Sequence, residues 1–249
     1  KFCEMVKPRF LSYDYYQWWW GAASHFRWLE VHREVAQRYG LPMLVWVEAN
    51  ADPRWEWGKP GATYLPDNLP KIRQSVYTSL AYGAKGIQWF VWTLIFERSP
   101  QDRNKPGPAL TEAGRDVAKI NRELRVLGPV LVRLQSTAVY HTEPVPPGTR
   151  PFPQDAPVAV SGRHITAGFF EGADKSTFVM IVNRHIGSRA WPKLVFHRSV
   201  KAVEMLDRQS GRWRLLQTHA EPDGRPSLRV VLDKGDGVLL RLRGKPAQL

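Results

Sequence analysis

The chain lacks several residue patterns that would assign a function at once. It has one cysteine, Cys3, among 249 residues, which excludes an intrachain disulfide. No apolar run approaches the roughly 20 residues that a membrane-spanning helix needs. The histidines share no metal-ligand spacing, and neither a GxSxG element nor a phosphate-binding loop is present. These absences favour carboxylate chemistry, and we expect no metal and no cofactor.

A concentrated basic segment is also missing, although the formal net charge is +13, from 36 Lys and Arg against 23 Asp and Glu. Such a charge would suit nucleic acid or an anionic surface, but the basic residues are dispersed and no nucleic-acid motif occurs. The charge therefore predicts a basic solvated surface, without nucleic-acid or membrane partners. Because Lys1 is neither an initiator methionine nor the start of a signal peptide, we expect the sequence to begin within a longer protein or after processing.

The first half of the chain alternates short apolar runs with segments of helical periodicity. The predicted strands are 9–13, 43–47 and 86–93, and the predicted helices are 25–39, one starting at Asp67 or Asn68, and 111–127. In the first helix we expect Trp28, Val31, Val35 and Tyr39 to share the buried face. This rhythm is typical of a parallel sheet. Three units cannot close an eight-stranded barrel, so the region is either a small open α/β layer or part of a barrel.

The second half of the chain has a different pattern. Six prolines between Pro144 and Pro157 predict a rigid linker. Short alternating strands separated by turn residues follow from Ile165 onward, which is typical of an antiparallel β-sandwich. The predicted division is a partial (β/α) barrel over 1–137, an extended proline-rich linker over 138–163 and a β-sandwich over 164–249.

Glu48 is the first candidate catalytic residue. It ends the apolar run 43–47 and precedes a loop that carries Trp55 and Trp57. A carboxylate at the carboxyl end of a buried parallel strand is where a (β/α) barrel carries its chemistry. The alternative is an exposed glutamate that begins a polar loop. Nine of the eleven tryptophans lie at or before Trp92, so the ligand site is expected in the α/β half.

The motifs SYDYY, LVWVEAN, ADPRWEWG and SLAYGAKGIQWFVWT, in this order and before a β-sandwich, resemble a known family. They are similar to the last three units and accessory domain of a clan A glycoside hydrolase with a TIM-type (β/α)8 barrel, of the β-galactosidase type and especially family 42. The resemblance implies hydrolysis of β-linked glycosides with retention. It places Glu48 at the nucleophile position. The acid/base would be the second residue of an Asn-Glu pair, which does not occur in this sequence.

Retaining hydrolysis needs two carboxyl groups about 5–5.5 Å apart, one of them ionised as the nucleophile. The Glu48 pKa should therefore stay low, and the Tyr13 hydroxyl is our candidate for a stabilising hydrogen bond. Asp14 could bind sugar hydroxyls or, alternatively, cap a loop or helix. Asn50, which closes the VEAN motif, is a further substrate-binding candidate.

Aromatic and acidic residues of the loops complete the expected substrate site. Trp55, Trp57 and Trp92 could stack on sugar rings, although core packing is the more common role of a tryptophan. Trp89 and Trp92 should lie on opposite faces of one strand. Glu97 could bind substrate or remain a solvated charge. The alternative function is a non-catalytic carbohydrate-binding or structural protein that kept the fold. The resemblance also allows a homo-oligomer and a secreted or periplasmic location.

Overall fold

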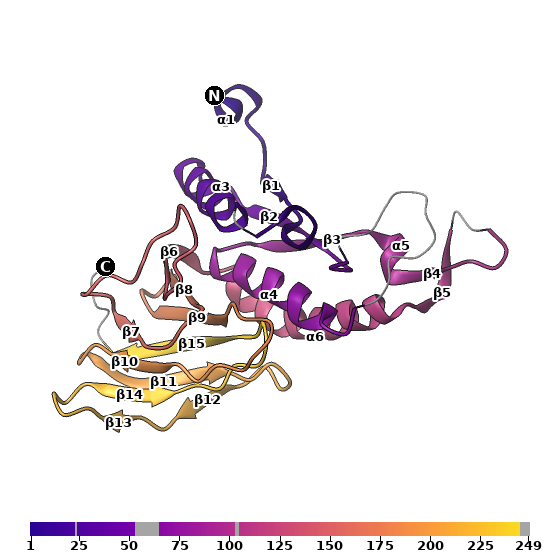
Figure 1. Ribbon diagram of the computed structural model, residues 1–249. Coiled ribbons are helices and arrows are strands. Elements are labelled where there is room, and N and C mark those ends of the chain that lie inside the picture. Colours follow the sequence, from indigo (N-terminus) through magenta and orange to yellow (C-terminus); the bar gives the residue numbers. More distant parts are fainter. Residues whose placement is uncertain (23, 53–64, 103–104, 245–249) are drawn as a thin grey trace.

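The computed structural model describes residues 1–22, 24–52, 65–102 and 105–244, with the Trp92 side chain also left out. Its first region is an α/β layer (Figure 1). The elements of this region are α1 (Phe2–Val6), β1 (Leu11–Asp14), α2 (Gln17–Trp20), α3 (His25–Tyr39), β2 (Met43–Glu48), α4 (Asn68–Ala81), β3 (Gly86–Phe90), α5 (Trp92–Ile95), β4 (Phe96–Arg98), β5 (Pro106–Leu110) and α6 (Glu112–Leu131). Strands β1, β2 and β3 form a parallel sheet in that order. The three expected strands thus pair in parallel, and no closed barrel is formed by the described residues.

The two faces of this sheet differ. Leu11, Tyr13 and the buried residues Met43, Val45 and Val47 point to one face, against the helices. On the other face the register aligns Ser12 with Leu44 and Asp14 with Trp46, and Ser12 and Asp14 are exposed. Because side chains alternate along a strand, Glu48 belongs to this second face. The second face is uncovered within the described residues except at its carboxyl end.

Helix α3 has the predicted bounds but buries a different face from the predicted one. Trp28 and Val31 are 43% and 37% exposed. Val35 and Tyr39 pack partly buried against the core, as expected. The fully buried positions are His25, Phe26, Leu29, Glu30, Arg33 and Ala36. Burial of the Arg33 guanidinium is possible because its Nε donates to Ser136 Oγ at 2.9 Å and its Nη1 pairs with Glu30 at 3.3 Å. Apolar periodicity could not reveal an inward face that contains a paired charge.

The second region is an antiparallel sandwich of two sheets. One has the order β12-β11-β15-β9-β8-β6 and the other β13-β14-β10-β7. The strands are β6 (Gln135–His141), β7 (Val158–Val160), β8 (Ile165–Glu171), β9 (Thr177–Asn183), β10 (Lys193–Phe196), β11 (Val200–Leu206), β12 (Trp213–Leu216), β13 (His219–Ala220), β14 (Pro226–Arg229) and β15 (Gly237–Gly244). Phe169, Ile181, Leu194 and Phe196 fill the space between the sheets.

The stretch expected to be an extended linker, 138–163, contributes strands at both of its ends. Residues up to His141 belong to β6, which pairs with β8, and Val158–Val160 forms β7, which pairs with β10. The prediction missed these strands because proline content dominates the segment, whereas the sheet pairing comes from residues distant in sequence. Only 142–157 connects the two strands.

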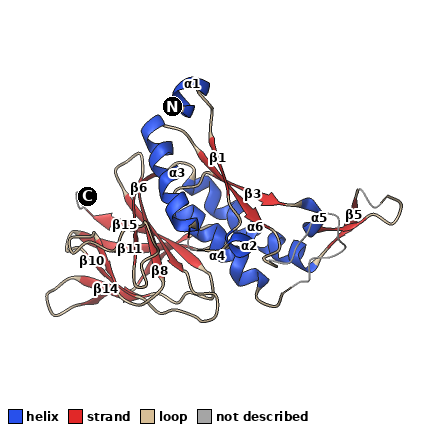
Figure 2. Ribbon diagram, turned by 45° about the horizontal axis from the view of Figure 1, so that its top comes forward, coloured by secondary structure: helices blue, strands red, loops and turns tan. Residues whose placement is uncertain are grey.

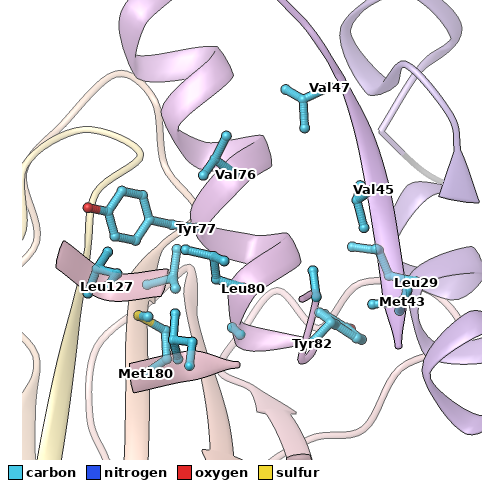
Figure 3. Packing of buried hydrophobic residues seen from close by; sticks show 14 of the residues in the cluster. Leu29, Met43, Val45, Val47, Val76, Tyr77, Leu80, Tyr82, Leu127 and Met180 are labelled. Carbon is cyan, nitrogen blue, oxygen red and sulfur yellow. The ribbon is translucent and has the colours of Figure 1, made fainter. Parts of the chain in front are cut away.

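The two regions share one core. Helix α4 packs against β8 and β9, and Figures 1 and 2 show α4 and α6 between the parallel sheet and the sandwich. Figure 3 shows Val76, Tyr77 and Leu80 of α4 lying between the β2 residues and Met180 of β9. At Gly168 of β8 the approach is so close that an added Cβ would overlap the carbonyl oxygen of Ala81. The helices therefore join the sheet to the sandwich by direct packing.

Candidate active site

Glu48 is the last residue of β2 and is 1% exposed. Its Oε1 accepts a hydrogen bond from the backbone N–H of Trp18 in α2, at 3.0 Å. Burial raises the pKa of Glu48 to about 7, and the Trp18 N–H, which favours the charged carboxylate, offsets only part of that effect. We expected a low pKa. The structure gives the opposite direction, because α2 covers the carboxyl group and removes it from water.

Tyr13 does not provide the hydrogen bond that we expected for Glu48. It is aligned with Val45 and points to the helix-covered face, opposite to Glu48. Its hydroxyl donates to the carbonyl oxygen of His25 at 3.1 Å and lies 3.2 Å from His25 Nδ1. Strand alternation is the reason, since Tyr13 and Glu48 fall on positions of opposite parity in the aligned strands. The Trp18 backbone takes the role that we had assigned to Tyr13.

Asp14 lies at the carboxyl end of β1, aligned with Trp46, and is exposed on the Glu48 face. The Tyr16 hydroxyl is hydrogen-bonded to Asp14. Burial and this hydrogen bond, with the nearby Asp14 and Glu48 charges, raise the pKa of Tyr16 above its usual value. The arrangement brings the carboxyl groups of Asp14 and Glu48 to the same sheet edge, with the buried Tyr16 beside them. An exposed acid beside a tyrosine hydroxyl can accept hydrogen bonds from a polar ligand.

Aromatic rings surround this edge. The Tyr16 ring centroid lies 4.9 Å from that of Trp19, 5.2 Å from that of Trp20 and 4.9 Å from that of Phe90. Trp46 contacts Phe90 edge-on at 6.5 Å. We did not single out Tyr16, Trp18, Trp46 or Phe90 from the sequence. Alternation along β2 could have indicated Trp46, which is two residues before Glu48 and therefore on its face.

The remaining predicted site residues have mixed outcomes. Asn50 is buried, with Oδ1 accepting from the Asp52 N–H at 3.1 Å and its carbonyl accepting from Trp19 Nε1 at 3.1 Å, so it holds the turn after β2. Trp55 and Trp57 lie outside the described residues. Glu97 belongs to β4 and is exposed. The β4–β5 hairpin projects away from the sheet (Figure 1).

Trp92 begins helix α5 instead of continuing β3, which ends at Phe90. The expectation that Trp89 and Trp92 alternate on one strand is therefore wrong. Trp89 is aligned with Val47 and its Nε1 donates to Asn121 Oδ1 of α6 at 3.0 Å, so it faces the helices. The prediction failed because an apolar run of this length can be strand, helix or both.

The chemistry available at this edge is that of carboxyl groups and aromatic rings. Among residues 1–22, 24–52, 65–102 and 105–244, no three or more His, Cys, Asp and Glu side chains are grouped to hold a metal ion. None of the helices in the described ranges is long and apolar enough to span a bilayer. A buried carboxyl with a raised pKa can exchange a proton near neutral pH or, once ionised, attack an electrophilic carbon.

Comparison with known proteins gives distant structural similarity. No family model matches the sequence, and no curated protein matches it. A candidate α-N-acetylgalactosaminidase from Bacillus halodurans C-125 aligns at TM-score 0.48 and 12% identity, covering 94% of this chain and 44% of that protein. A GH51 arabinofuranosidase from Xanthomonas axonopodis pv. citri aligns at TM-score 0.35 and 10% identity, over 93% and 57% of the two chains.

A GH27 β-L-arabinopyranosidase from Geobacillus stearothermophilus aligns at TM-score 0.32 and 8% identity, over 91% of this chain and 63% of that one. These structural neighbours are glycoside hydrolases, and this chain spans less than two thirds of the length of each. None of the three is described as a family 42 enzyme, so the narrower resemblance stays a prediction.

Proposed function

We propose that this chain is part of a glycoside hydrolase that cleaves β-linked glycosides with retention. Glu48 is the nucleophile, and the acid/base carboxyl comes from a segment outside this sequence. The observation that carries the proposal is the Glu48 carboxyl itself. It is buried under α2 at the carboxyl end of a central parallel strand, on the sheet face opposite to Val45 and Val47 and among aromatic rings.

Glu48 can act in covalent catalysis in its ionised form, which burial disfavours and the Trp18 N–H favours. The ionised carboxylate would attack the anomeric carbon, and the Trp18 N–H would hold its Oε1 so that the free oxygen faces the sugar. Because burial raises the Glu48 pKa to about 7, about half of the groups are ionised at neutral pH. The nucleophilic form therefore grows with pH, and the rate should rise through this pKa.

The same edge offers contacts to a sugar. Asp14 and the Tyr16 hydroxyl would accept or donate hydrogen bonds to ring hydroxyls, while Trp46 and Phe90 would contact the apolar ring face. Trp55, Trp57, Trp92, Asn50 and Glu97 remain proposed contributors to the substrate site. The proposed substrate is a neutral β-glycoside, since the edge carries carboxylates that would repel an anion.

The decisive experiment uses the full natural polypeptide with an aryl β-glycoside. Glu48→Gln should lower kcat/KM by on the order of 10⁴-fold. Glu48→Ala with sodium azide should recover turnover and yield a glycosyl azide of inverted anomeric configuration, since azide replaces the nucleophile. Glu171→Gln, on the distant strand β8, is the matched control and should keep its activity.

Turnover that survives Glu48→Gln would overturn the nucleophile assignment. The alternative, a non-catalytic carbohydrate-binding protein, is favoured by one observation: Glu48 is the only buried carboxyl on this sheet face among the described residues. It predicts that the full polypeptide binds the glycoside without turnover in either variant.

A further inference from the structure

A second concave surface lies on the opposite side of helix α6 from the parallel sheet. It is a cavity of about 800 Å³ between α6 and the β11–β12 end of the sandwich. Five cationic side chains line it: Arg73, Lys119, Arg122, Arg208 and Arg214. Cavities of this size hold ligands larger than a single inorganic ion. The proposed catalytic edge does not include any of these residues.

Two of the five cations are already neutralised by carboxylates of the protein. Arg208 forms two hydrogen bonds with Asp236, at 2.6 and 3.0 Å, and Arg73 pairs with Glu123 at 2.5 Å. Glu123 also accepts from the Tyr77 hydroxyl at 2.7 Å. These four charged groups form a fixed network that joins α4, α6 and the sandwich. Arg73, Glu123 and Arg208 line the cavity, but their mutual pairing and the Asp236 contact leave them unable to turn to a ligand.

The other three cations remain available. Lys119 pairs with Asp116 at 3.2 Å and Arg214 with Asp207 at 3.7 Å, and the two basic side chains are 49% and 60% exposed. The Arg214–Asp207 pair is solvent-accessible and contributes little, so Arg214 can turn to another anion. Asp116 is only 3% exposed, so Lys119 keeps this partner, but its half-exposed ammonium group has further N–H donors for a second anion. Arg122 is exposed and forms no ion pair within the part of the chain that the structure describes. Lys119, Arg122 and Arg214 thus form a set of three cations open to solvent.

The rest of the lining restricts the ligand. Val126, Leu206 and Val231 add apolar surface beside the cations, and Val231 is 61% exposed. No aromatic side chain is found among the described lining residues, so bases of a single-stranded nucleic acid would have nothing to stack on. Lys119 and Arg122 are three residues apart on α6, so their Cα atoms are separated by about 4.5 Å along the helix axis. Acidic groups on neighbouring sugar rings could therefore meet both.

We propose that this cavity binds an acidic oligosaccharide, whose carboxylate or sulfate groups are held by Lys119, Arg122 and Arg214 while its ring faces contact the valines. Guanidinium groups bind such oxyanions through two parallel hydrogen bonds. Arg122 and Arg214 should therefore contribute more to the affinity than Lys119. The site is independent of the role of Glu48. It would hold an acidic glycan on the sandwich side of the protein while the sheet edge processes a neutral unit.

The test is calorimetric titration of the full chain with a hexagalacturonate and, separately, with a fully sulfated hexasaccharide. We expect at least one to bind with an affinity that falls as salt rises, and the better ligand distinguishes carboxylate from sulfate recognition. Neutral cellohexaose should not compete. The double variant Arg122→Gln/Arg214→Gln should weaken binding at least tenfold, whereas Arg125→Gln, an exposed arginine of α6 outside the lining, should not.

An equal loss in Arg125→Gln would overturn the proposal, because binding would then follow net charge alone. Equal or tighter binding of hexaglutamate or of a six-nucleotide oligothymidylate would overturn it as well, as would no binding of either acidic sugar at millimolar concentration. Glu48→Gln must leave this binding unchanged. Failure of the catalytic proposal and failure of this one are therefore seen in different variants.

Discussion

The parallel sheet and the sandwich bury their strands in different ways. In the sandwich, Phe169, Ile181 and Phe196 are fully buried between two sheets. In the parallel sheet, Met43, Val45 and Val47 are buried on one face only, and the other carries Ser12, Asp14 and Trp46. The sandwich is closed on itself, whereas the parallel sheet keeps a polar face. The packing of the sandwich and of the helix-covered face contributes the free energy of folding that offsets the cost of burying the Glu48 carboxyl.

The difference in packing between the two regions can be tested by removing one aromatic ring from each. Phe169→Ala should lower the free energy of unfolding by about 3–5 kcal/mol, because it leaves a cavity between two packed sheets. Phe90→Ala, in the half-buried cluster at the sheet edge, should lower it by only roughly 1–2 kcal/mol. Urea denaturation measures both. Equal losses would mean that the sheet edge is as tightly packed as the sandwich core.

The ionised form of Glu48 should lower the free energy of unfolding, because its carboxylate is buried. Its pKa is about 7 in the folded protein against a usual 4.5, so the folded state binds the proton more tightly. Stability contributed by the protonated group is therefore present below pH 4.5 and is lost as pH rises to about 7. The loss is at most roughly 3 kcal/mol.

Glu48→Gln should accordingly raise the free energy of unfolding at pH 8 by up to roughly 3 kcal/mol while leaving it almost unchanged at pH 4. The glutamine Oε1 can still accept the Trp18 N–H. Denaturation at the two pH values measures the difference, and Glu171→Gln serves again as the control. A variant that is less stable than the parent at pH 8 would contradict the burial of an ionisable carboxyl.

The shared core can be tested at Gly168. Gly168→Ala should lower the free energy of unfolding by about 2 kcal/mol, since its Cβ would displace the Ala81 backbone of α4. Gly128→Ala in α6 meets nothing within 4 Å and should instead gain up to about 1 kcal/mol. Both variants should unfold in one transition. Two separate transitions in Gly168→Ala would show that the regions unfold independently.

The smallest expected effect is at the start of α6. Thr111 Oγ1 accepts from the Gly114 N–H at 3.0 Å and donates to the Leu94 carbonyl at 2.6 Å. Thr111→Ala should lower the free energy of unfolding by about 1 kcal/mol, and Thr111→Ser should restore most of it. Thermal denaturation compares the two. Equal stability of Thr111→Ala and Thr111→Ser would show that the Thr111 cap is not needed, because packing alone orders the start of α6.

The secondary structure was largely predictable from local signals. The bounds of α3 agree with the prediction, and β2 extends the predicted 43–47 by one residue. Helices α4 and α6 follow Asp67 and Thr111, the predicted starting positions. Periodicity and capping act within a few residues, so they can be recognised along the chain. The terminal β6 and β7 strands were missed because they are defined by pairing with β8 and β10, far away in sequence.

The properties of the candidate active site were likewise only partly predictable from local sequence. The sequence alone indicated that Glu48 ends a buried strand, because a run of apolar residues stops there. Tertiary structure decided that Tyr13 faces His25 and that Trp18 bonds Glu48. It also decided that α3 buries Arg33 in place of Trp28, and that burial raises the Glu48 pKa. These properties depend on which distant groups exclude water from a side chain and supply its partners, and no local pattern contains that information.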